Sequence, residues 1–132
     1  MINELKLCHQ ASRTVRNIHL ANCNLKDKGL SGLRADSINL ENANLREVIL
    51  TNVNWRSCSL RDSDLKAESF TDAIVRMCNF DHMRAEEANF IKTRFGNCTA
   101  LGAQFKNTSF SNAVLSETDF SRSSFFARNF PQ

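Results

Sequence analysis

The sequence predicts an all-β solenoid, a chain wound in square coils around one apolar core, and three observations support this. First, every fifth residue from Val15 to Phe130, here called a centre, is apolar without a break of register. A period of five fits neither the helix nor the strand, so the chain must turn at a fixed short interval. Second, the position two before each centre is usually small, and one large and one small inward residue per repeat would fill a narrow tube. Third, the remaining positions are mostly Asn, Asp, Ser, Thr, Arg or Lys, which favours an outward orientation.

The elements follow in order along one domain. Residues 1–12 fall outside the strong pattern, and we expect them to form an N-terminal cap segment, helical or irregular. Such a cap would cover the unpaired backbone and apolar side chains at an open solenoid end. Residues 13–132 form the repeat region, in which each coil packs only on its neighbours.

Several five-residue stretches carry a more specific pattern. Residues 43–47 read ANLRE, residues 63–67 read SDLKA and residues 88–92 read ANFIK. In these stretches the chain resembles the pentapeptide-repeat family, and the resemblance covers about residues 13 to 130. It implies a right-handed quadrilateral parallel β-helix with four repeats per coil and about six coils. Residues twenty apart would then be stacked about 4.8 Å from one another.

The cysteines are explained by packing. All five occupy the small inward position: Cys8, Cys23, Cys58, Cys78 and Cys98. The last three should form one column, but three sulfurs in a line cannot surround a tetrahedral ion. An odd number of cysteines without a signal peptide also argues against a disulfide framework. We therefore expect inert buried thiols and no bound metal.

Catalytic patterns are weak. The histidines are His9, His19 and His82, and none belongs to a nucleophile, metal or acid-base motif. Asp62 and His82 share an outward column, yet an exposed pair of this kind is more often a surface contact. The glycines form no phosphate-binding loop. The sequence therefore predicts a protein that is not an enzyme and has no cofactor.

The outward charges form columns. Lys26, Arg46, Lys66 and Lys106 share one column, interrupted by Glu86, and Asp27, Glu47 and Glu87 occupy the next. These columns either keep the rod soluble or bind a partner. We assign six residues to the candidate partner-binding set: Lys26, Arg46, Lys66, Lys106, Lys28 and Glu68.

Lys28 and Glu68 stand at the inward position, where an unpaired charge would cost several kcal/mol. We therefore expect their side chains to reach solvent or to pair along their face.

A second basic group could engage phosphates or an acidic partner. It comprises Arg16, Arg56 and Arg76, with Arg34 and Arg94 nearby. No surface aromatic residues are interleaved with these arginines, so nucleic-acid binding is not favoured.

The middle of the chain is acidic. We assign an acidic waist to six residues: Asp62, Asp64, Asp72, Asp81, Glu86 and Glu87. The resemblance implies that some members act on DNA gyrase or topoisomerase as acidic DNA mimics, giving protection from quinolones or toxins. This chain departs from that pattern, because its net charge is +3 and its repeat phase leaves no place for a projecting loop. Gyrase modulation is therefore an alternative function, and an interaction module of a secreted bacterial effector is another.

The C-terminal half replaces leucine centres with phenylalanine. A homodimer through the C-terminal coil would cover this end, and its candidate interface is Phe110, Phe120, Phe125, Phe126 and Phe130. Alternatively, Pro131 and the side chains of the last turn suffice. The sequence has no signal-peptide pattern and no apolar run of membrane-spanning length, which predicts a cytoplasmic protein or one exported without a cleaved signal. The function predicted is a rigid rod that binds a protein partner.

Overall fold

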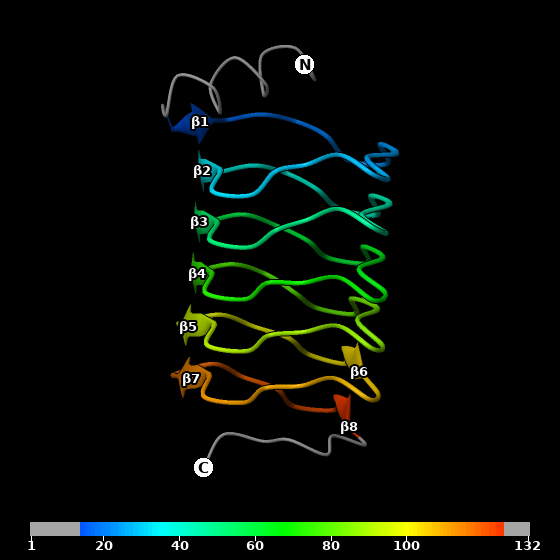
Figure 1. Cartoon of the computed structure of the whole chain (residues 1–132), viewed down its shortest axis with the longest axis vertical. Coiled ribbons are helices and arrows are strands. Elements are labelled where there is room, and N and C mark those ends of the chain that lie inside the picture. The colour runs from blue at the N-terminus through cyan, green and yellow to red at the C-terminus, as the bar shows by residue number, and fades with distance from the viewer. Residues whose placement is uncertain (1–13, 126–132) are drawn as a thin grey trace.

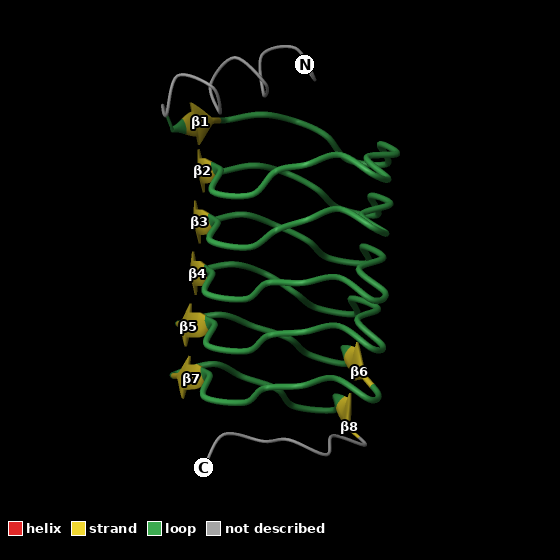
Figure 2. Cartoon of the chain, viewed as in Figure 1, coloured by secondary structure: helices red, strands yellow, loops and turns green. Residues whose placement is uncertain are grey.

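The computed structural model describes residues 14–125, which form an all-strand parallel solenoid of about six turns (Figures 1 and 2). Its strands are β1 (Val15–Arg16), β2 (Arg34–Asp36), β3 (Asn54–Arg56), β4 (Ile74–Arg76), β5 (Arg94–Gly96), β6 (Gln104–Phe105), β7 (Val114–Ser116) and β8 (Ser124–Phe125). The predicted cap segment, residues 1–12, lies outside the described residues.

Four parallel ladders run along the rod and confirm the square coil. One is a six-stranded sheet in the order β1-β2-β3-β4-β5-β7, whose outer surface we call the sheet face. The next ladder includes the bridge Asn39↔Ser59 and is called the polar face. The third includes Asn44↔Asp64 and ends in the β6–β8 pair, on the side of the rod opposite the sheet (Figure 1), and is called the opposite face. The fourth includes Ile49↔Ser69. Every partner is twenty residues away, as predicted, and the hand of the coil remains a prediction.

The corners of the coil depend on a left-handed residue two positions after each centre. Asn52 has a φ of 61° and Asp72 a φ of 62°. Asn, Asp and Gly adopt this conformation most readily, which explains why they recur there. Gly102, with a φ of 64°, has a second reason: an added Cβ would lie 2.8 Å from Nδ1 of His82.

Where the residue before a centre is Asn or Asp, its side chain can support the turn from outside. Oδ1 of Asn39 accepts a hydrogen bond of 2.9 Å from the amide of Glu41, and Oδ1 of Asn79 accepts one of 2.8 Å from the amide of Asp81. Asn and Asp side chains favour such bonds to an amide two residues on. This contact gives a physical reason for Asn or Asp at that position of the repeat.

The centres and the small positions form the core, as predicted. Because equivalent residues lie one coil apart, aromatic centres stack in register. The rings of Phe70 and Phe90 lie 5.0 Å apart with an interplanar angle of 11°, and those of Phe90 and Phe110 lie 5.3 Å apart at 8°. Trp55 is also fully buried, and its Nε1 has no hydrogen-bond partner within the described part of the chain.

Glu68 contradicts a prediction. Its side chain neither reaches solvent nor pairs, because the residue is 3% exposed and Oε1 has no hydrogen-bond partner among residues 14–125. Burial, together with the nearby acids Glu47, Asp27 and Asp64, raises the pKa of Glu68 to about 8. The cost of a buried charge is thus avoided by retaining a proton rather than by finding a cation. Lys28, in the same inward column, is half-buried.

Candidate interaction surfaces

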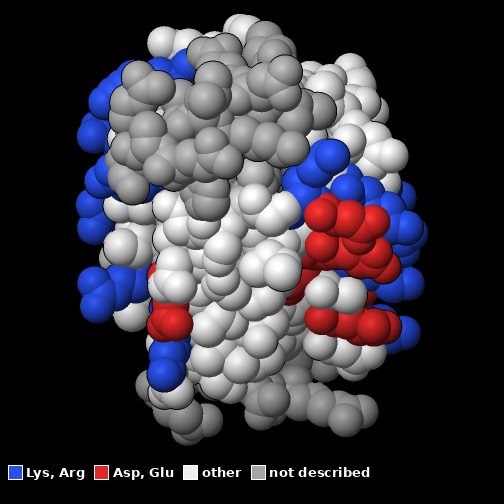
Figure 3. Space-filling model, turned by 45° about the horizontal axis from the view of Figure 1, so that its top comes forward, with Lys and Arg blue, Asp and Glu red and all other residues white. Residues whose placement is uncertain are grey.

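The sheet face carries one exposed arginine on each of five successive strands. Along a strand, residues on either side of an inward centre point outward. The arginines are Arg16 on β1, Arg34 on β2, Arg56 on β3, Arg76 on β4 and Arg94 on β5. In Figure 3 basic side chains follow the left edge of the molecule, where these strands lie in Figure 1. Asp36 is the acidic residue within these strands, and its carboxylate accepts a hydrogen bond from Ser37.

Three of these arginines are available to a partner. Arg56 and Arg76 are register partners on adjacent strands, so two cations are stacked directly. Arg56, Arg76 and Arg94 form no ion pair with any residue between 14 and 125. Gly96 leaves room beside them: a Cβ there would lie 3.6 Å from Cγ of Arg76, in ordinary van der Waals contact.

Apolar side chains adjoin the arginines on the sheet face. Met77 is 46% exposed at the corner after β4, and Val114 is 51% exposed on β7. A shallow groove of about 520 Å³ runs along the other edge of the sheet. It is lined by Asp72, Ile74, Lys92, Arg94, Asn112 and Val114. This side of the rod therefore combines open cations with accessible apolar surface.

The opposite face carries the lysine-rich column that the sequence predicts. Lys26, Arg46, Lys66 and Lys106 follow successive centres of this face, with Glu86 between the last two. Here acidic neighbours pair with Lys26 and Arg46, whereas no ion pair within residues 14–125 involves Lys66 or Lys106. Nζ of Lys26 lies 3.9 Å from Oε2 of Glu47.

Among these acids, Asp64 forms two ion pairs. Its Oδ2 lies 3.4 Å from Nε of Arg46 and 3.6 Å from Nη2 of Arg84. Figure 3 shows the mixture of acidic and basic side chains at the right.

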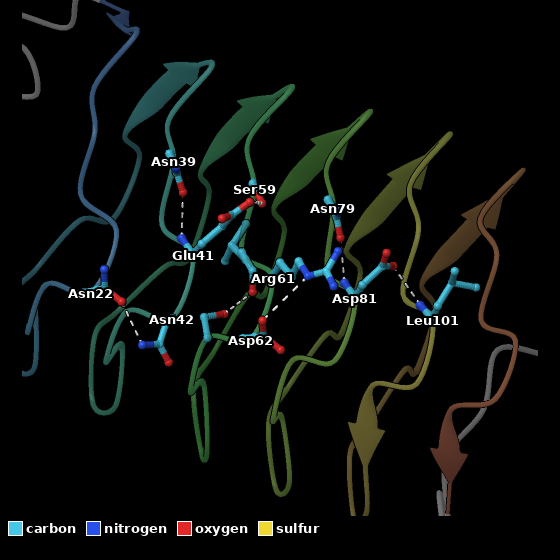
Figure 4. A network of polar contacts seen from close by, with 12 residues as sticks. Asn22, Asn39, Glu41, Asn42, Ser59, Arg61, Asp62, Asn79, Asp81 and Leu101 are labelled. Carbon is cyan, nitrogen blue, oxygen red and sulfur yellow. Dashed lines mark hydrogen bonds and ion pairs between the residues drawn. The ribbon is translucent and has the colours of Figure 1, made fainter.

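On the polar face, side chains of neighbouring coils are hydrogen-bonded to one another and to the backbone (Figure 4). Nδ2 of Asn42 donates to Oδ1 of Asn22 at 2.8 Å, and Oγ of Ser59 donates to Oε1 of Glu41 at 3.1 Å. Further along, Oδ1 of Asp81 accepts from the amide of Leu101 at 2.9 Å. These bonds link successive coils.

The Asp62–His82 column on the polar face does not form an acid-base pair. Asp62 lies 3.6 Å from Arg61, and no hydrogen bond joins Asp62 to His82 within residues 14–125. The His82 ring instead lies against Gly102.

The acidic waist is spread around the rod. Asp62 and Asp81 belong to the polar face, and Asp72 lies at the corner next to the sheet. Asp64, Glu86 and Glu87 belong to the opposite face, where Asp64 is held between two arginines. The six residues are thus not gathered into one negative surface.

The cysteine column is part of the core. Cys58, Cys78 and Cys98 are buried, and Sγ of Cys98 donates to the carbonyl of Val75 at 3.3 Å. The adjacent Cys78 thiol lowers the pKa of Cys98 to about 7. Cys23 is half-buried against the core, and Cys8 lies outside the described residues. Between residues 14 and 125 no three potential ligands are placed to hold a metal ion.

The proposed dimer residues fall into three groups. Phe110 is fully buried, whereas Phe120 and Phe125 are half-buried in the last described coil. Phe126 and Phe130 lie outside the described residues. The homodimer therefore stays a prediction.

Sequence reasoning placed the lysine-rich column first among the binding candidates and missed the apolar component of the sheet face. The available signal was the apolar residue at an outward position, as at Ile74, Met77 and Val114. No helix in the described part of the chain is long and apolar enough to cross a membrane.

Comparisons with known proteins agree with this architecture. Two family models match the chain: the one described as pentapeptide repeats (8 copies) matches residues 38–67, and the one described as pentapeptide repeats (9 copies) matches residues 70–114. Together they match more than half of the chain. A search of curated proteins found no match.

Among solved structures, the pentapeptide repeat protein Rfr23 from the cyanobacterium Cyanothece 51142 is 13% identical over 100% of both chains, with a TM-score of 0.72. Full-length QnrB1, a plasmid-mediated fluoroquinolone resistance protein, is 15% identical with a TM-score of 0.77. That match covers 83% of this chain and 59% of QnrB1. At these identities the likeness concerns the fold alone.

Proposed function

Because the chain belongs to the pentapeptide repeat family, we propose that it acts without catalysis, as a rigid rod that binds a protein partner through a lateral face. The observation that carries this proposal is the sheet face. Five successive strands present exposed arginines there, and Met77 and Val114 add exposed apolar surface. Arg and Met are enriched in protein interfaces, and exposed apolar groups beside charged ones are typical of docking surfaces.

The coil geometry suits such a role. Each coil is hydrogen-bonded to its neighbours through the backbone, as where the amide of Asn79 donates to the carbonyl of Cys58 at 2.9 Å. Outward side chains are therefore held at a fixed spacing, and a partner that binds them pays little for ordering the backbone.

A capture experiment tests this function. The immobilised full chain would be compared with Arg56→Glu/Arg76→Glu on the sheet face and Lys66→Glu/Lys106→Glu on the opposite face. We expect one double variant to lose a partner that the other retains, with unchanged circular dichroism for both. If neither reversal alters the captured proteins, binding through a lateral charged face is wrong.

Modulation of DNA gyrase or topoisomerase is a second candidate. Its support is the fold shared with QnrB1, whose role is fluoroquinolone resistance. Gyrase supercoiling in the presence of a quinolone, with increasing amounts of the full chain, tests it: restored supercoiling supports the candidate, and unchanged inhibition at large excess rejects it. A role as the interaction module of a secreted effector would use the same lateral binding and would be tested by capture from host-cell extract.

A further inference from the structure

We propose that the sheet face binds an acidic α-helix of the partner protein, lying along the rod axis with one row of carboxylates over the arginine row. This inference rests on the proposed function, because it names the face and the chemistry of the partner. The arginine row consists of Arg16, Arg34, Arg56, Arg76 and Arg94.

The spacing of the arginines favours a helix. One arginine per strand over β1–β5 gives a charge about every 4.8 Å along the rod axis and a row about 19 Å long. Within this row Arg16, Arg56 and Arg76 follow the centre of their strands, and Arg34 and Arg94 precede it in the adjacent column. A helix that places acidic residues alternately three and four apart presents one carboxylate about every 5.3 Å on one face. The mismatch is about 0.5 Å per step, which long arginine side chains can absorb.

Other anionic partners match the row less well. An extended strand presents same-face side chains about every 6.7 Å, so its carboxylates would fall out of step within a few rungs. Duplex DNA carries one charge per about 1.7 Å of its axis, far denser than the arginine row. Single-stranded nucleic acid usually stacks its bases on aromatic side chains, and the outward residues of β1–β5 and β7 include no aromatic residue.

The energetics of the free rod point the same way. Arg56 and Arg76 are paired in register without an acidic residue between them, and like charges directly opposite on neighbouring strands are destabilising. A carboxylate placed over both would remove that repulsion. Arginine also binds carboxylates through two parallel hydrogen bonds, which fixes the orientation of the bound helix.

The groove next to the arginines gives the helix a second point of contact. Ile74 and Val114 line it together with Arg94. A helix whose acidic stripe covers the arginines would direct its flanking side chains towards this groove, where apolar residues would be partly buried. This apolar component makes a protein a better fit than a simple polyanion.

The opposing charges on this side weaken the row locally. Asp36 on β2 lies within the row, and Asp72 lies in the groove with Lys92. The strongest segment of the face is therefore β3 to β5, with Arg56, Arg76 and Arg94.

Binding of a synthetic helix to the purified full chain tests the inference. The probe is a fluorescent three-heptad peptide with Glu at positions a and d and Leu at position e. Its control has the same composition with the Glu residues distributed around the helix. We expect the striped peptide to bind at least about tenfold more tightly in fluorescence anisotropy, a difference of about 1.4 kcal/mol.

Two double variants locate the site. Arg56→Glu/Arg76→Glu should weaken binding of the striped peptide by more than about tenfold, whereas Lys66→Glu/Lys106→Glu should change it by less than about threefold. Circular dichroism and the melting temperature of both variants check that the solenoid is retained. Equal losses in the two variants would overturn the assignment to the sheet face.

Three further results would overturn the inference. Equal binding of the striped and redistributed peptides would mean that the spacing is irrelevant. Equal binding of poly-glutamate would reduce the site to a general anion surface, and tighter binding of a DNA duplex would make phosphates the partner chemistry. The proposed function can outlast each of these results, because the capture experiment would still show whether a lateral face binds a protein.

Discussion

The sheet face and the opposite face are built by the same coil, and each carries a row of cations, but only the opposite face pairs part of its row, Lys26 and Arg46, with its own acidic residues. On the opposite face, Glu47 and Asp64 lie within ion-pair distance of Lys26 and Arg46. On the sheet face, Arg56 and Arg76 face solvent without an ionic partner in the described chain. Charge that a face does not satisfy internally is available to another molecule.

The difference arises from which residues adjoin each cation. Around the opposite face, the positions one before and two after a centre supply Asp64, Glu47 and Glu87. Around the sheet, the corresponding positions supply mostly Asn, Ser and apolar residues, such as Asn54, Ser57 and Ile74. The coil thus fixes the positions of the side chains, and the residue types at a few positions decide whether the cations of a face have acidic neighbours on the rod itself.

The largest expected effect concerns Glu68, whose pKa is raised in part by acids of the opposite face. In the unfolded chain this carboxyl titrates near 4.5, and in the folded chain near 8. Below about pH 4.5 the Glu68 carboxyl is protonated in both the folded and the unfolded chain, so its ionisation does not change the free energy of unfolding. Between about pH 4.5 and pH 8 the unfolded carboxyl loses its proton while the folded one retains it, so the free energy of unfolding falls by up to about 5 kcal/mol over this range and changes little above it.

Glu68→Gln removes this titration. The free energy of unfolding, measured by urea at a series of pH values, should match wild type near pH 4 and exceed it increasingly up to about pH 8. Glu87→Gln, an exposed change on the opposite face, is the matched control and should follow the wild-type curve. A Glu68→Gln curve parallel to wild type at every pH would show that the carboxyl is not held neutral.

The sequence could predict the coil because the coil repeats a local rule. Val15 to Phe130 keep one period, and the stacking of residues twenty apart follows from it. The site is different, because charge pairing depends on side-chain contacts between coils. The sequence could place Arg46 and Asp64 on neighbouring coils, but not their separation of 3.4 Å. The prediction for Glu68 was wrong for a related reason. The pattern showed its inward position, but not that the side chain would stay buried in its protonated form.

The comparison of the two faces predicts that an Arg→Glu change lowers the stability of the fold on the opposite face and raises it on the sheet face. Arg46→Glu would lose the contact with Asp64 and add a third acid beside Glu47, so we expect a destabilisation of about 1 kcal/mol. Arg76→Glu would replace repulsion with Arg56 by attraction, so we expect a gain of about 0.5 kcal/mol.

Urea unfolding at low ionic strength measures both changes. Because the charges are exposed, both effects should shrink in 1 M salt, where the screening length is about 3 Å. A loss of stability in both variants would mean that the arginine row is not under electrostatic repulsion.

The smallest expected effect comes from neutralising one acid on each face. Asp64→Asn would weaken two ion pairs around a side chain that is 18% exposed, and should cost about 0.5 to 1 kcal/mol. It should retain the hydrogen bond that Oδ1 accepts from the amide of Lys66 at 3.1 Å, so the turn is preserved. Asp36→Asn, which has no ion pair within residues 14–125, should cost less than half as much. Thermal melts at low salt can resolve the two, and an equal cost would mean that the sheet face neutralises its own charge as fully as the opposite face does.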